Sequence, residues 1–157
     1  MDEQEFWRII ALFNWKRTGN DEAVLKPAVA ALAKHSEDDI AAFEEILSRK
    51  LYALDTLEHA RNIGEDAYVD DSKHFSVDWF LYARCCVVAN GKKFYESVLE
   101  DPTKFPHDME FESLLGLTDA AYEAKTGRES DGFQTSVSYE TFSNRAGWSA
   151  ARGKSRG

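Results

Sequence analysis

Hydrophobic residues near the amino end recur at spacings of three and four, with acidic residues just before them. Residues at these spacings share one face of a helix, and acids suit a helix's first turn. The pattern predicts a short amphipathic helix, whose inward residues are Phe6, Ile9, Ile10 and Phe13. A second helix is expected from Asp21, which can cap it, to about Ala33.

The longest helical pattern follows Ser36, which can cap a first turn that has Asp39 three residues later. Hydrophobic residues then continue at spacings of three and four, so we expect one long helix over residues 36–63. Gly64 can supply a left-handed stop. The acidic stretch that follows is therefore expected to be a connection between helices.

Residues 76–90 form the most continuously apolar segment and begin with Ser76, another possible cap. A buried strand competes with a buried helix here, because two adjacent valines favour a strand. The segment is long for a strand and contains two alanines, which prefer helices. A helix buried on most sides is the favoured prediction.

The remaining elements are a short helix over residues 92–101 and a last helix from Asp108 or Glu110 to Gly127. Turn residues and scattered aromatics then predict an irregular wrap over the body. Its expected anchors are Phe133, Tyr139, Phe142 and Trp148. The predicted fold is mainly α: a single compact domain over 1–148 of about six helices with a C-terminal wrap, and a disordered basic tail over 149–157.

Charge is distributed unevenly along the chain. The 157 residues carry a formal net charge of −9, but no acid follows Glu140 and four basic residues follow position 144, so residues 1–144 carry −13. Such a surface repels phosphate backbones, so a nucleic-acid ligand is disfavoured. It suits a basic protein partner instead.

Cysteine usage and the amino end indicate the compartment. Cys85 and Cys86 are adjacent inside the apolar segment, so they cannot cross-link distant parts of the chain, and they are expected to be reduced. The amino end has acids where a signal peptide needs basic residues, and no apolar run has the length of a membrane span. We expect a soluble cytoplasmic protein without a membrane partner.

Several blocks of the sequence occur together in one order: EFW, KLYALDTLEHARNIGEDAYVDD, FLYARCCVVANG, DMEFESLLGLTDAAYE and VSYETFSNRAGW. In these blocks the chain resembles a bacterial family of domains of unknown function, number 4240 in that series. The resemblance extends nearly to Trp148. It implies a compact, mostly helical bacterial domain and brings no established activity.

The acidic stretch EDAYVDDSKHF is the first candidate for chemistry. Clustered carboxylates can hold a divalent cation, with Asp66, Asp70 and Asp71 as candidate ligands, but their order matches no calcium-loop pattern. A solvated turn whose acids cap the next helix is the favoured interpretation. No cofactor is predicted, and a divalent metal stays open as the weaker hypothesis.

A polar cleft between the helices 36–63 and 76–90 is the second candidate. Asp55 and His59 lie four residues apart, so the carboxylate could orient the imidazole as a general base needs. Arg84 is embedded in apolar sequence and should have a carboxylate partner, for which Asp70 or Asp71 is the natural choice. The candidate catalytic residues are Asp55, His59 and Arg84, and the candidate ligand-binding residues are Tyr68, Asp70, Asp71 and Arg84.

The sequence favours a binding or regulatory accessory protein whose acidic surface engages a basic partner. The alternative is a small enzyme, a metal-assisted hydrolase or acid–base catalyst, that uses the polar cleft. A third possibility is a helical module with an apolar peptide groove, which an exposed Trp7 or Trp15 would support.

Overall fold

The chain folds into helices joined by turns, and the computed structural model describes residues 1–149. Within that range no strand occurs, which confirms the mainly α prediction. The elements are α1 (Glu3–Ile10), η1 (Trp15–Arg17), α2 (Asp21–Ala33), α3 (Glu37–Ala53), α4 (Leu57–Ala60), α5 (Val77–Ala89), α6 (Lys92–Glu100), η2 (Pro102–Lys104), η3 (Glu112–Gly116) and α7 (Leu117–Thr126), where η marks a 3-10 helix. One more helical stretch begins at residue 145. The predicted disordered tail lies outside the described residues except for Ser149, which is helical.

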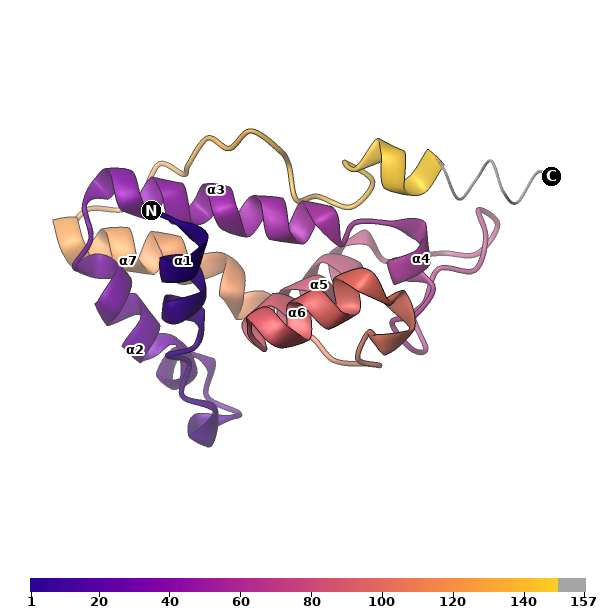
Figure 1. The fold of residues 1–157 in the computed structure, drawn as a ribbon, viewed down its shortest axis with the longest axis horizontal. Coiled ribbons are helices and arrows are strands. Elements are labelled where there is room, and N and C mark those ends of the chain that lie inside the picture. The colour runs from indigo at the N-terminus through magenta and orange to yellow at the C-terminus, as the bar shows by residue number, and fades with distance from the viewer. Residues whose placement is uncertain (150–157) are drawn as a thin grey trace.

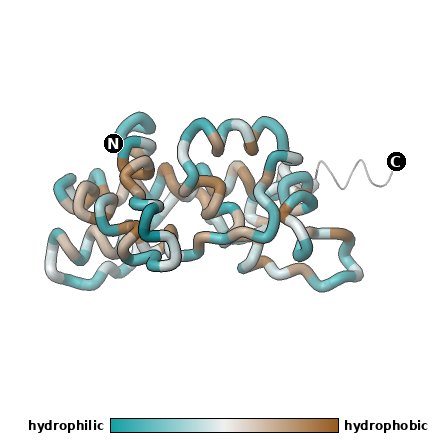
Figure 2. Tube along the Cα trace, turned by 90° about the horizontal axis from the view of Figure 1, so that it is seen from below, coloured by the Kyte–Doolittle hydropathy of each residue, from teal (hydrophilic) through white to brown (hydrophobic). Residues whose placement is uncertain are grey.

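The longest helix, α3, forms the spine of the fold (Figure 1). At its amino end α1, α2 and α7 pack together, and α5 packs on it further along with α6 beside it. The core between them is aromatic, with the rings of Phe6 and Phe43 4.7 Å apart. Brown and teal positions alternate along the helices in Figure 2, as expected where each helix buries one face.

The apolar segment is the helix α5, so the strand alternative is wrong. The side chain of Ser76 accepts a hydrogen bond from the backbone N–H of Trp79, as predicted for a cap. Nine of the thirteen residues of α5 are buried, which explains its nearly continuous apolar sequence. None of the helices described is long and apolar enough to cross a membrane.

The predicted long helix over 36–63 is interrupted, which corrects the sequence reading. α3 ends at Ala53, and the short helix α4 starts anew with Thr56 as its cap, accepting from the N–H of His59 at 3.1 Å. Asp and Thr side chains compete for nearby backbone groups and so favour such breaks. Asp55 lies in the break and does not share a helical face with His59.

The last helix begins at Leu117, later than the predicted start at Asp108 or Glu110. Long-range hydrogen bonds hold the segment before it in an irregular path. The N–H of Asp108 donates to Ile63 O at 2.9 Å, and the N–H of Phe111 donates to Tyr82 O at 3.0 Å. Gly127 ends α7 with φ of 72°, as the sequence predicts.

Candidate functional site

Residues 135–148, which we call the strap, run along α3 toward α4 (Figure 1). At its start, the N–H and the hydroxyl of Ser136 donate to the carboxylate of Glu45 at 2.6 and 2.7 Å. Arg49 donates to the same carboxylate from one helical turn away. These donors, those of Ser136 first, lower the pKa of Glu45 to about 2. The strap is therefore fastened to α3 through an ionised carboxylate.

Asp55 is the second attachment point of the strap, and its side chain is fully buried. Oδ1 accepts from the N–H of Phe142 at 3.1 Å and from Nε1 of Trp148 at 2.9 Å. Oδ2 accepts from the N–H of Asn144 at 3.0 Å. A buried carboxylate is tolerated only when donors replace its water, and here the strap supplies all three of these donors.

Arg84 on α5 is the third attachment point and is also fully buried. Its Nη1 donates to Leu51 O and Tyr139 O at 2.9 Å each, and its Nη2 donates to the hydroxyl of Thr141 at 3.0 Å. Nε has no hydrogen-bond partner among residues 1–149. Burial lowers the pKa of Arg84, and the negative charge of Asp55 acts in the opposite direction.

The predicted partners of Arg84 are wrong, because neither Asp70 nor Asp71 forms an ion pair with it in the described part of the chain. Both acids are exposed and bond within their own loop. Asp70 accepts from the N–H of Ser72 at 2.9 Å, and Asp71 accepts from the hydroxyl of Tyr68. The guanidinium instead uses carbonyl and hydroxyl oxygens.

The structure tests the predicted metal site in the acidic loop only in part. Nowhere in residues 1–149 do three or more His, Cys, Asp or Glu side chains gather closely enough to hold a metal ion. The hydrogen bonds of Ser72 lower the pKa of Asp70, as in an ordinary polar turn. A metal at Asp66, Asp70 and Asp71 stays a prediction.

His59 is buried, and both of its ring nitrogens have partners inside the protein. Because Val98 O can only accept, Nε2 carries the proton that it donates over 2.9 Å. Nδ1 then accepts from the hydroxyl of Thr56 at 2.7 Å. Burial lowers the pKa of His59, which favours the neutral ring. Its catalytic role, like those of Asp55 and Arg84, stays a prediction.

Aromatic rings complete the surface under the strap. The indole of Trp148 lies 5.5 Å from the ring of Tyr68 and 6.2 Å from that of Phe80. Tyr68 is thus brought next to the strap, and the ligand-binding role predicted for Tyr68, Asp70, Asp71 and Arg84 stays a prediction. We call Glu45, Asp55, Phe80 and Arg84 the strap-binding surface.

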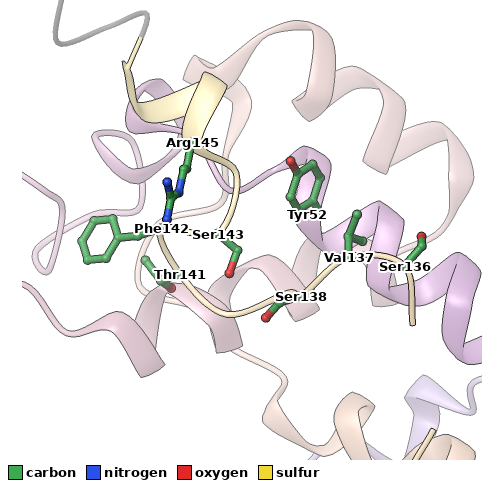
Figure 3. A pocket seen from close by; sticks show the side chains of 8 residues that line it. All are labelled: Tyr52, Ser136, Val137, Ser138, Thr141, Phe142, Ser143 and Arg145. Atoms are coloured by element: carbon green, nitrogen blue, oxygen red, sulfur yellow. The ribbon is translucent and has the colours of Figure 1, made fainter. Parts of the chain in front are cut away.

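A shallow hollow of about 540 Å³ lies between Tyr52 and the strap (Figure 3). The strap lines it with the hydroxyl groups of Ser138, Thr141 and Ser143 and with the guanidinium of Arg145. Thr141 already accepts from Arg84 and donates to Val77 O at 2.7 Å. The hollow is therefore formed by the path of the strap, which these bonds help to fix.

A second surface, which sequence reasoning missed, surrounds Tyr82 on α5. The bond from Phe111 to Tyr82 O and the bond from Thr141 to Val77 O bring three distant segments together there. They carry four exposed carboxylates, which we call the acidic face: Asp78, Glu110, Glu112 and Glu140. A signal was present in the sequence, since five acids and no Lys or Arg occur between Lys104 and Lys125.

The charges of the acidic face act on Tyr82. Partial burial and then the negative charges of Glu112, Asp78 and Glu140 raise the pKa of its phenol. Of the ion pairs formed within residues 1–149, none involves the four carboxylates of this face. Two large apolar side chains beside it are also exposed, Val77 by 40% and Met109 by 55%.

Residues 1–124 match the family described as Protein of unknown function (DUF4240). The chain belongs to this family. No curated protein and no solved structure matches the chain. The match covers most of the acidic face and all of the strap-binding surface, whereas the strap itself lies beyond the matched residues.

Proposed function

We propose that this DUF4240 protein is a cytoplasmic accessory protein of bacteria that binds a basic segment of a partner protein through the acidic face. One observation carries the proposal: the four carboxylates of this face are gathered from three segments around Tyr82, and no Lys or Arg within residues 1–149 forms an ion pair with them. Two buried free cysteines fit a reducing compartment. The bacterial origin rests on the sequence resemblance.

Like charges repel one another, and within residues 1–149 no ion pair offsets the repulsion among the four carboxylates. Lysines or arginines of a partner would relieve this repulsion and would speed the encounter of the two proteins. The same charge disfavours a nucleic-acid ligand.

Apolar contact would add to the charge attraction. Val77 and Met109 are exposed directly beside Asp78 and Glu110 in the sequence. Tyr82 supplies an aromatic ring at the centre, and rings of this kind are common anchors in protein interfaces. The expected partner segment therefore combines basic residues with at least one apolar side chain.

A labelled synthetic peptide of lysines interspersed with leucines is a suitable probe. We expect its affinity, measured by fluorescence anisotropy, to fall steeply as salt is raised from about 50 to about 500 mM, because salt screens exposed charges. Changing Asp78 to Asn and Glu110, Glu112 and Glu140 to Gln should weaken binding by about ten-fold or more and flatten the salt dependence.

The control changes four exposed acids elsewhere and so alters the net charge equally: Glu96→Gln, Glu100→Gln, Glu129→Gln and Asp131→Asn. Binding to this control should stay close to that of the wild type. If both variants lose affinity equally, the attraction is spread over the whole protein and the acidic face is not a binding site.

The alternative of a small enzyme is not favoured by a specific observation. Asp55 and Arg84 are covered by the strap, and both ring nitrogens of His59 bond inside the protein. The exposed Trp15, 40% accessible, was the sign expected of a peptide groove, whereas Trp7 is buried. A peptide-binding groove near Trp15 would differ from the proposed site in its place and in its apolar chemistry.

A further inference from the structure

We propose that the strap-binding surface is a peptide-docking site, filled within one chain by its own strap and able to take the strap of a second copy instead. This inference does not rest on the acidic face or its partner, although Glu140 belongs both to the strap and to that face. It concerns the way in which residues 135–148 are held and what their release would uncover.

The surface recognises the strap through main-chain groups as well as through side chains. Asp55 accepts two backbone N–H groups, of Phe142 and Asn144, and Arg84 donates to a backbone carbonyl, of Tyr139. Main-chain recognition of this kind is how proteins commonly bind extended peptides. The side-chain contacts that add selectivity are the hydroxyl of Ser136 on Glu45, the hydroxyl of Thr141 on Arg84 and the indole of Trp148 on Asp55.

The strap contributes one buried side chain, that of Trp148, to the hydrophobic core. Among residues 135–148 only Trp148 is buried, and the others are half-buried or exposed. The surface beneath it is different, because it holds a buried carboxylate and a buried guanidinium that are not paired with each other. Without a strap both charges would lack most of their partners, so an empty surface would bind a replacement strongly.

The strap of a second copy would fit this surface, because it presents the same carbonyl, N–H groups and indole as the strap of the chain itself. The segment between Gly127 and the strap has no regular structure, so it can change direction without breaking a helix. Exchange of an identical segment between copies requires no new interface chemistry. The surface lies within the family-matched residues and the strap lies outside them, as separable parts would.

The test uses the full-length chain with strap variants and a labelled synthetic peptide of residues 135–149. In the wild type the attached strap competes with the peptide. The apparent affinity is therefore the intrinsic affinity multiplied by the fraction of chains whose strap has left the surface. Trp148→Ala removes the buried anchor from the attached strap only. We expect this variant to bind the peptide more tightly than the wild type does, by about ten-fold or more.

Asn144→Ala is a second strap-opening variant, in case the first does not fold. It removes the amide that donates to Tyr52 O and accepts from the N–H of Gly147, and it leaves the indole in place. Gln134→Ala, an exposed change before the strap, is the matched control and should bind like the wild type. Circular dichroism identifies which variants keep their helices.

Binding to a folded strap-opened variant, lost when the tryptophan of the peptide is replaced by alanine, would support docking in trans. If a folded strap-opened variant binds the peptide no better than the wild type, the strap is a fixed part of the fold and the proposal is wrong. Binding that a scrambled peptide reproduces would overturn it as well, because the contacts described here depend on order.

Discussion

Replacing Asp55 with Asn removes the charge from the buried carboxylate while keeping its size. The carboxylate accepts three N–H groups of the strap through two oxygens. An amide has only one accepting oxygen, so at least one of these N–H groups faces an NH₂ group that cannot accept. Arg84 also loses the negative charge that opposes its desolvation.

The magnitude follows from these losses. A hydrogen bond to a charged group contributes about 1.5–3 kcal/mol, and removal of one partner from a buried charged set costs about 3–5 kcal/mol. We therefore expect Asp55→Asn to lower the free energy of unfolding by about 3–5 kcal/mol. In a domain of this size 1 kcal/mol corresponds to about 2–4 °C in Tm, so Tm should fall by about 10 °C.

Thermal unfolding followed by circular dichroism measures this change, with urea unfolding as a check. Asp70→Asn is the matched control, because Asp70 is exposed and bonds within its own loop. Its Tm should stay within about 2 °C of the wild type. If Asp55→Asn also shifts Tm by no more than this, the strap is not held by the carboxylate as described.

Three further predictions concern other buried groups. Arg84→Met should lower the free energy of unfolding by about 3 kcal/mol in urea titrations, because the carbonyls of Leu51 and Tyr139 lose their donor; a stability equal to that of the wild type would contradict this. Burial lowers the pKa of His59, so as the pH falls the imidazole is protonated in the unfolded chain before it is protonated in the folded one. The free energy of unfolding should therefore fall as pH drops below about 6.5, and it should fall by less in His59→Gln. Equal pH profiles of the two proteins would contradict a buried, neutral His59. Burial raises the pKa values of Cys85 and Cys86, so both thiols should react slowly with a disulfide reagent at pH 8 and rapidly in urea, whereas fast reaction of the folded protein would exclude their burial.

The sequence was most informative where structure depends on neighbouring residues. The caps at Ser36 and Ser76 and the stop at Gly127 are found as predicted, because each acts within one helical turn. The length and composition of the apolar segment also favoured a helix correctly. Local chemistry of this kind is visible in a short stretch of sequence.

The candidate site could be predicted only in part. Arg84 was singled out as a charge that needs a partner and Asp55 as a carboxylate that could orient His59, and both side chains have hydrogen-bond partners. Apart from Leu51 O, these partners lie on the strap, 55 to 93 positions away in the chain, so no local pattern could identify them. Asp70 and Asp71 were the natural choice as partners of Arg84 by distance along the chain, but in the fold they do not pair with it.

The acidic face was missed for a related reason. Its carboxylates come from three segments, and only the fold shows that they surround one tyrosine. The wrap with Tyr139, Phe142 and Trp148 was predicted, but Phe142 is not the buried anchor that was expected. Trp148 is buried, whereas Phe142 is 42% exposed and contributes its backbone N–H.

The most direct test of the acidic face is hydrogen–deuterium exchange of the full-length protein with and without the lysine–leucine peptide. The proposed function predicts slower exchange of backbone amides around residues 77–82 and 110–113, with unchanged exchange in α6. Slower exchange confined to α6, or spread evenly over the chain, would contradict a binding site centred on Tyr82.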